Sequence, residues 1–165
     1  MNDSELMALS QSLGEALRRR SQTVTAAESC TGGWVAKVLT DIAGSSAWFE
    51  RGFVTYSNDA KAQMLGVSLD ALSAFGAVSE PVVRQMAQGA LLAAKADYAI
   101  AISGIAGPDG GSVEKPVGTV WFGFATQENR ILTYRKCFSG DREAIRMQAT
   151  AFALKTLWQQ FLQNA

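Results

Sequence analysis

The sequence predicts an α/β fold, a three-layer α/β/α sandwich built on a mixed sheet of about five strands. Short apolar runs alternate along the chain with segments whose apolar residues recur every three or four positions. The run 98–102 is apolar almost throughout, which is typical of a central strand covered on both faces. The runs 117–126 and 130–138 are separated by three polar residues and predict an antiparallel hairpin, so the sheet should be mixed.

The remaining elements follow from periodicity and from cap residues. An amphipathic opening helix is predicted over 4–20, where leucines recur at steps of three and four. Strands are predicted over 22–27 and after Arg51, and Ser79 followed by Pro81 starts a further helix. The other predicted helices span 33–40, the segment from Ser57 to Gly66, 68–75, and the C-terminal part after the cap at 139–142.

Composition limits the classes of function. With 165 residues, 48% of them hydrophobic, the chain fits one globular domain over residues 1–165. Lys plus Arg and Asp plus Glu both number 15, so we expect a small-molecule partner and no nucleic acid. There is no signal peptide or long apolar run, so we expect no membrane and a cytoplasmic protein. Cys30 and Cys137 are expected to be reduced thiols in the core.

Histidine is absent from the sequence, and this removes several reaction classes. A Ser-His-Asp triad, a Cys-His dyad and a His-ligated zinc site are all excluded. If a serine is the nucleophile, its base must be Lys, Tyr, Asp or Glu. Without histidine or a cysteine cluster no strong transition-metal site is evident, and a serine nucleophile with such a base requires neither a metal nor an organic cofactor.

The segment 27–34 reads as the end of a strand, a tight turn and the start of a helix. Backbone N–H groups at such a helix start lack an intrahelical partner, so those around Thr31, Gly32 and Gly33 can hold an oxyanion or a phosphate near Ser29. Serine, threonine and glycine are also ordinary turn residues. From this stretch alone, the structural interpretation is the simpler one.

Two more candidate segments follow strand ends. Tyr56 and Lys61 flank a second strand-to-helix junction, and Ser103 opens a glycine-rich segment that includes Gly104 and Gly107. This segment matches no phosphate-binding motif, and an exposed loop without a role also explains it. Ligands of α/β sheets bind beyond the carboxyl ends of the strands, so these candidates are expected to share one edge with the serine turn.

These residues suggest a serine nucleophile activated by a neutral lysine. Only a largely enclosed site would lower the pKa of Lys61 enough for it to be a base, and Tyr56 could pass a proton or orient the amine. Arg142 and Arg146 lie one helical turn apart, which suits phosphate or carboxylate recognition and equally a solvated surface pair.

Four long strings carry a resemblance to a known family. They are AESCTGGWVAKVLTDIAGSSAWFERGFVTYSNDAKAQMLGV, GAVSEPVV, ISGIAGPDGGSVEKPVGTVWFGFAT and FSGDREAIRMQAT. Together they resemble the CinA C-terminal domain family over essentially the whole chain. The resemblance implies hydrolysis of the carboxamide of nicotinamide mononucleotide to nicotinate mononucleotide and ammonia, in recycling of pyridine nucleotides. The family's serine falls on Ser29, its lysine on Lys61 and its nearby tyrosine on Tyr56.

Two alternatives and one assembly state remain open at this stage. The chain could be a non-catalytic nucleotide-binding or regulatory module, or a Ser-Lys amidase or esterase for another small substrate. Larger members of the family have an additional N-terminal domain without a counterpart here, so that domain's activities are not expected. The wide apolar face of the last helix and the pair Trp48 and Phe49, taken as exposed, predict a homodimer.

Overall fold

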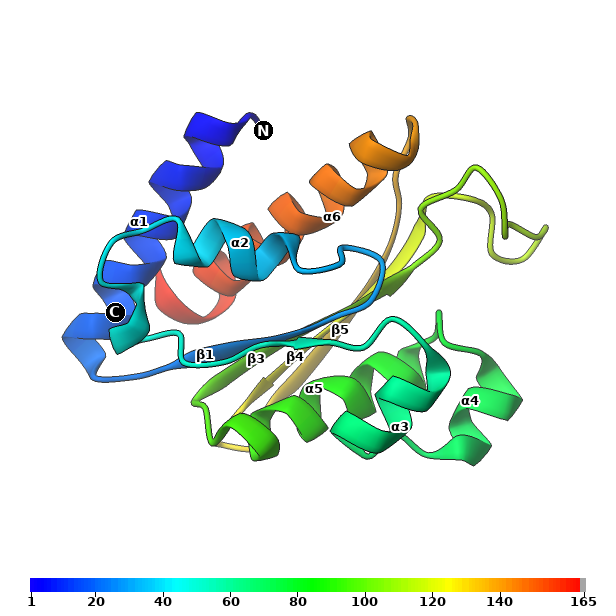
Figure 1. Ribbon diagram of the computed structural model, residues 1–165, viewed down its shortest axis with the longest axis horizontal. Helices are drawn as coiled ribbons and strands as arrows, with labels where there is room; N and C mark the ends of the chain where they lie inside the picture. Colours follow the sequence, from blue (N-terminus) through cyan, green and yellow to red (C-terminus); the bar gives the residue numbers. More distant parts are fainter. Residues whose placement is uncertain (164–165) are drawn as a thin grey trace.

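The computed structural model describes residues 1–163 and arranges them in three layers around one sheet (Figure 1). The helices and strands are α1 (Asp3–Arg20), β1 (Val24–Glu28), α2 (Trp34–Thr40), η1 (Ser45–Ala47), β2 (Phe53–Val54), α3 (Asn58–Leu65), α4 (Leu69–Phe75), α5 (Glu80–Ala94), β3 (Tyr98–Gly104), β4 (Thr119–Thr126), β5 (Ile131–Cys137), α6 (Arg142–Leu157) and η2 (Trp158–Leu162). The strand order is β2-β1-β3-β4-β5, with β1 parallel to β2 and β3. Strand β4 runs antiparallel to both of its neighbours, β3 and β5. The predicted mixed five-stranded sheet is therefore confirmed.

The two faces of the sheet are covered by different sets of helices. Helices α1, α2 and α6 lie on one face and α3, α4 and α5 on the other (Figure 1). Along β3, Ile100 and Ile102 contribute to the core under the first set, whereas Ala99 and Ala101 contribute to the core under α5. The small residues let α5 pack close to the sheet. A Cβ atom added at Gly123 would lie 2.6 Å from the carbonyl oxygen of Val83.

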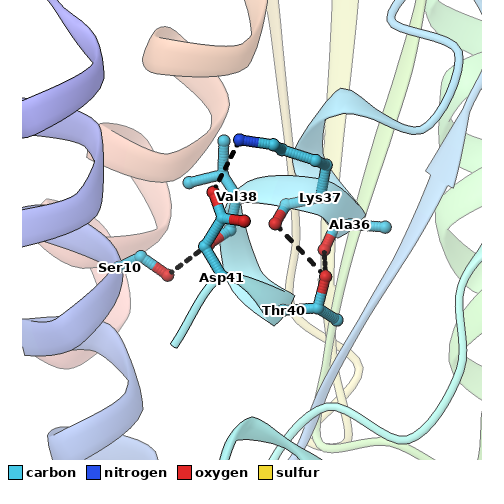
Figure 2. A network of polar contacts seen from close by, with 6 residues as sticks. All are labelled: Ser10, Ala36, Lys37, Val38, Thr40 and Asp41. Carbon is cyan, nitrogen blue, oxygen red and sulfur yellow. Dashed lines mark hydrogen bonds and ion pairs between the residues drawn. The ribbon is translucent and has the colours of Figure 1, made fainter. Parts of the chain in front are cut away.

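Helix α2 follows the serine turn and is held at its far end (Figure 2). The hydroxyl of Ser10, on α1, donates to the carbonyl of Val38 over 3.2 Å. Lys37 pairs with Asp41 at 2.8 Å, and the hydroxyl of Thr40 donates to the carbonyl of Ala36 at 2.7 Å. A helix of seven residues has little stability of its own, so the two local contacts support its last turn and the bond from Ser10 helps to fix its position.

The sequence located most helix starts through their cap residues. The side chains of Ser57, Ser68 and Asp141 accept hydrogen bonds from backbone N–H groups in the first turns of α3, α4 and α6. Ser79 also stands at the predicted N-cap of α5, but its hydroxyl donates to the carbonyl of Gly76 instead. That bond ties α5 to the loop that precedes it.

Three expectations about burial were wrong. Trp48 and Phe49 are buried, with 1% and 8% of their surfaces exposed. The ring of Trp48 packs onto Gly14 of α1, where an added Cβ atom would lie 2.5 Å from the ring. Cys30 is a buried free thiol as expected, but Cys137 is exposed, because it ends the edge strand β5.

Candidate active site

The candidate site is a cleft at the carboxyl ends of the parallel strands. Its volume is about 290 Å³, near the lower end of the ~300–1,000 Å³ range of small-molecule sites. All three segments that the sequence placed at one edge contribute to it, together with the α4–α5 loop and the start of α6. The lining residues are Ser29, Cys30, Tyr56, Asn58, Lys61, Ala77, Val78, Ser103, Gly104, Ile105, Ala106, Gly107, Asp109, Gly110 and Arg142.

A serine and a lysine meet at the base of this cleft. The Nζ atom of Lys61, on α3, lies 3.0 Å from the Oγ atom of Ser29, which follows β1 directly. Lys61 is 1% exposed and Ser29 is 8% exposed. The pair is therefore close enough for proton transfer and is largely shielded from bulk water.

Two backbone carbonyls complete the surroundings of the lysine amine. Lys61 Nζ donates to the carbonyl of Thr55 at 2.9 Å and to that of Tyr56 at 3.4 Å. A neutral amine has two N–H donors and one lone pair. When the two carbonyls accept both donors, the lone pair is left for the Ser29 hydroxyl, which is the arrangement that a general base requires.

Burial lowers the pKa of the Lys61 ammonium, because the charged form loses its hydration in the protein interior. Among residues 1–163, no carboxylate forms an ion pair with this amine. The neighbouring Cys30 acts in the opposite direction, toward a higher Lys61 pKa. Its influence is limited, because burial raises the pKa of the Cys30 thiol to about 11 and the thiol stays neutral near pH 7.

Glu28 anchors the serine turn to the start of α2, a structural role that the sequence did not predict. Its carboxylate is 1% exposed and accepts N–H groups from Gly33 at 3.2 Å, Val35 at 2.9 Å and Ala36 at 3.0 Å. It thereby takes the place that an anionic ligand would have at the start of α2. A glutamate directly before a serine turn is the only sequence signal for this role.

The turn after Ser29 differs from the expected oxyanion site. The N–H of Gly32 donates to the carbonyl of Ser29 at 3.0 Å, and the N–H of Gly33 is bound to Glu28. Both groups are already used within the protein, contrary to the expectation. Across residues 1–163, the N–H groups of Cys30 and Thr31 donate to no other residue, and of these two only Cys30 lines the cleft.

The hydroxyl of Tyr56 lies at the mouth of the site, away from the lysine amine. Tyr56 is 60% exposed, and its hydroxyl accepts from Arg142 at 2.8 Å. Arg142 also donates to the carbonyl of Gly107 at 2.8 Å, so it joins the glycine-rich segment to the cleft. Tyr56 thus contacts Lys61 through its backbone carbonyl, whereas its hydroxyl is bound to Arg142 and is not placed to pass a proton to the amine.

The two arginines of α6 are separated by the serine turn. Arg142 lines the cleft, whereas Arg146 lies on the outer side of the turn. Arg146 donates to the carbonyls of Cys30 at 2.9 Å and Thr31 at 3.2 Å, and its guanidinium stands 5.6 Å from the ring centre of Trp34. Of the two arginines expected to bind phosphate or carboxylate, only Arg142 therefore lines the cleft.

Ser103 and Gly104 form the end of β3 and line the cleft beside the dyad. The Ser103 side chain is 1% exposed. Residues 1–163 contain no cluster of three or more acidic or cysteine side chains suited to a metal ion. Over the same residues, no helix is both long and apolar enough to cross a bilayer.

Together these features define a class of protein, an α/β enzyme whose cleft holds a serine and a buried lysine. The family model described as "CinA C-terminal domain" matches residues 6–161, so the chain belongs to that family. This confirms the resemblance noted in the sequence.

Relatives of this chain include named amidohydrolases and competence-related proteins. The chain is 74% identical over 164 residues to "Nicotinamide-nucleotide amidohydrolase PncC" of Escherichia coli (strain K12), covering 99% of both chains. It is 50% identical to a "Putative competence-damage inducible protein" of Symbiobacterium thermophilum, covering 92% of this chain but 37% of that protein. A crystal structure titled "competence/damage inducible protein CihA" from Agrobacterium tumefaciens superposes with a TM-score of 0.92 at 43% identity, covering 96% of each chain.

Proposed function

We propose that this protein hydrolyses the carboxamide of nicotinamide mononucleotide to nicotinate mononucleotide and ammonia. The observation that carries the proposal is the 3.0 Å contact between Lys61 Nζ and Ser29 Oγ in a buried setting without a carboxylate partner. That contact supports transfer of an acyl group to a serine nucleophile. The substrate is suggested by the shared name of relatives that are 74% identical over almost the full length.

The first half of the reaction forms an acyl-enzyme. Neutral Lys61 takes the proton of Ser29 while Oγ attacks the carboxamide carbon, and the carbonyl oxygen becomes an oxyanion. The Lys61 ammonium then gives its proton to the amide nitrogen, the C–N bond breaks, and ammonia leaves. The product of this half is a nicotinoyl ester on Ser29, with Lys61 neutral again.

The second half releases the acid. Lys61 takes a proton from a water molecule that attacks the ester carbon, and the ester bond to Ser29 breaks. The proton returns from Lys61 to Ser29 Oγ, and the acid that forms gives its remaining proton to water or to the released ammonia, so nicotinate mononucleotide leaves as a carboxylate. Each group regains its starting protonation state, so the cycle needs neither a metal ion nor an organic cofactor.

The charge of the substrate suits this site. The ring nitrogen that carries the ribose is quaternary, so the pyridinium ring is cationic and disfavours a second positive charge on the nearby lysine. The same ring withdraws electrons from the carboxamide and makes its carbon easier to attack. The phosphate requires a cation farther from the dyad, and Arg142 at the mouth of the cleft meets that requirement.

Two groups can stabilise the oxyanion. The N–H of Cys30 follows the nucleophile directly, which is a common position for such a donor. Ser103 lines the same cleft, and its hydroxyl is a hydrogen-bond donor at the end of β3. The glycines of the segment 104–110 leave room for the nucleotide to approach the backbone.

The test is a direct assay of ammonia. Purified protein is incubated with nicotinamide mononucleotide, with nicotinamide riboside and with free nicotinamide, and ammonia is measured over time. We expect rapid release from the mononucleotide, slower release from the riboside and little from nicotinamide. Binding of the mononucleotide without release from any of the three would favour a non-catalytic nucleotide-binding module.

Three broader proposals accompany this reaction. The product feeds recycling of pyridine nucleotides, which supports a cytoplasmic location.

A homodimer is also proposed, although burial of Trp48 and Phe49 removes one of its two supports. The other support is the apolar face of α6, part of which, with Met147 and Phe152, lines a groove of about 670 Å³ between α1, α6 and β5. Light scattering at micromolar concentration tests the dimer.

A further inference from the structure

Arg146 is placed to act on the oxyanion site through the backbone of the serine turn. Its Nη2 atom donates to the carbonyl of Thr31 at 3.2 Å. That carbonyl belongs to the same peptide group as the N–H of Gly32, which donates to the carbonyl of Ser29 at 3.0 Å. The Ser29 carbonyl in turn shares a peptide group with the N–H of Cys30, the donor that follows the nucleophile.

These contacts form one chain of hydrogen bonds from a fixed positive charge to the reacting centre. A charge-assisted bond to a carbonyl polarises the whole peptide group and strengthens the bond that its N–H makes next. The second bond of Arg146, from Nε to the carbonyl of Cys30 at 2.9 Å, fixes the intervening peptide as well. The turn between Ser29 and Gly32 is thus held by a guanidinium at two successive carbonyls.

The local sequence fits this arrangement closely. Gly32 has a φ of 59° and Gly33 a φ of 104°, so both adopt backbone conformations that side chains disfavour. A Cβ atom at Gly32 would lie 3.2 Å from Nη2 of Arg146. Behind Arg146 the turn borders an open pocket of about 390 Å³ that is distinct from the cleft and includes Trp34 and Lys37. The guanidinium is therefore reachable from solvent without passage through the substrate cleft.

We infer that Arg146 is a positioning residue, which orients and polarises the Cys30 N–H toward the oxyanion and makes no contact with substrate. This inference rests on the proposed function, since it assumes that an oxyanion forms beside Ser29. Its consequence is a loss of kcat with little change in KM when Arg146 is replaced. A phosphate-binding arginine would behave in the opposite way.

The central experiment compares Arg146→Ala, Arg146→Gln and Arg146→Lys with wild type, using nicotinamide mononucleotide as substrate. We expect kcat of the Ala and Gln variants to fall about 10- to 100-fold, less than the ~10²–10³-fold loss of a whole oxyanion donor. KM should change less than about 3-fold, because ground-state binding is unaffected. Arg146→Lys keeps the charge, so its kcat should exceed that of Arg146→Gln. Lys155→Gln, an exposed cation on the same helix, is the matched control and should behave as wild type.

Chemical rescue adds a readout that a purely structural role would not move. Guanidinium ion at millimolar concentration should enter the open pocket of Arg146→Ala and restore kcat several-fold, and it should leave wild type and Lys155→Gln unchanged. An unchanged kcat in Arg146→Ala, a rise in KM alone, or equal kcat for the Lys and Gln variants would overturn the inference. If the Ala variant does not fold, the comparison of Lys with Gln decides.

A second acyl donor separates this inference from the choice of substrate. Acetylation of Ser29 by p-nitrophenyl acetate, followed by mass spectrometry, forms the same kind of oxyanion without the nucleotide. If wild type acetylates but releases no ammonia from nicotinamide mononucleotide, the proposed substrate fails, and the acetylation rates of the same variants still test Arg146. If Ser29 of wild type is acylated by neither p-nitrophenyl acetate nor nicotinamide mononucleotide, both proposals fall.

Discussion

The Nζ atom of Lys61 lies 3.0 Å from the Oγ atom of Ser29, although the two residues are 32 positions apart in the chain. Ser29 follows β1 and Lys61 follows β2, and these strands are parallel neighbours in the sheet. Parallel neighbours end at the same edge, so two residues that follow them are brought together by the topology. The dyad is therefore a product of the sheet rather than of local sequence.

Replacing Ser29 by Ala should abolish amide hydrolysis while the fold survives. Loss of a serine nucleophile in comparable sites lowers kcat by up to about 10⁶-fold, and a change of at least about 10³-fold is expected here. Ammonia release measures activity and thermal unfolding measures the fold. Ser73→Ala, at an exposed position of α4, is the matched control. Turnover like that of wild type would rule out Ser29 as the nucleophile.

The pH dependence of kcat/KM should reveal the state of Lys61. The neutral amine is the active form, so kcat/KM rises as pH increases through the Lys61 pKa and then reaches a plateau. Burial lowers that pKa from its ordinary value of 10.5, so the rise should occur below this pH. The measurement is a pH series of kcat/KM at constant ionic strength.

The charge-preserving variant of Lys61 then separates a base from a simple cation. Arginine does not deprotonate in proteins, so Lys61→Arg should be nearly as inactive as Lys61→Ala, with kcat/KM reduced by about 10²–10⁴-fold. An active Lys61→Arg enzyme with an unchanged pH profile would instead move the search for the base to Tyr56 or Glu28.

Glu28→Gln should destabilise the protein. The buried carboxylate accepts three backbone N–H groups, whereas an amide offers one acceptor oxygen and turns its NH₂ toward donors. We expect the free energy of unfolding to fall by about 1–3 kcal/mol, as measured by chemical denaturation. Glu15→Gln, an exposed position on α1, should change it little. Loss of activity at full stability would show that Glu28 acts in the chemistry instead.

Arg142→Gln should raise KM for nicotinamide mononucleotide and leave kcat nearly unchanged. A hydrogen bond to a charged group contributes about 1.5–3 kcal/mol, so KM should rise about 10- to 150-fold. With nicotinamide riboside, which lacks the phosphate, the variant and wild type should have similar KM values. Arg135→Gln on β5 serves as the control for loss of an exposed arginine. An equal effect on both substrates would contradict a role in phosphate binding.

The sequence predicted the sheet, the order of its elements and the shared edge of the candidate residues. These features follow from periodicity and topology, which depend on the type of residue at each position. It did not predict that Glu28 fills the start of α2, because strand periodicity does not show where the last side chain of a strand is directed. It also paired Arg142 with Arg146, since a spacing of four gives one helix face but not the position of that face relative to the cleft.

The burial of Trp48 depends on a residue far away in the sequence. Nothing in the segment around Trp48 shows that Gly14 on α1 leaves space for its ring. Such complementarity between two elements appears only when they are packed together. The same reasoning covers Cys137, whose exposure follows from the position of β5 at the edge of the sheet.

The position of α6 late in the chain has a consequence for biosynthesis. The turn that carries Ser29 is synthesised early. Arg146, which contacts this turn, and Arg142, at the mouth of the cleft, both belong to α6 and are synthesised late. While the ribosome is still translating the hairpin of β4 and β5, the serine turn has no arginine behind it and the cleft has no cation at its mouth. A nascent chain that already contains Ser29 and Lys61 therefore still lacks the two groups proposed to support turnover, and we expect full activity only after the last helix has docked.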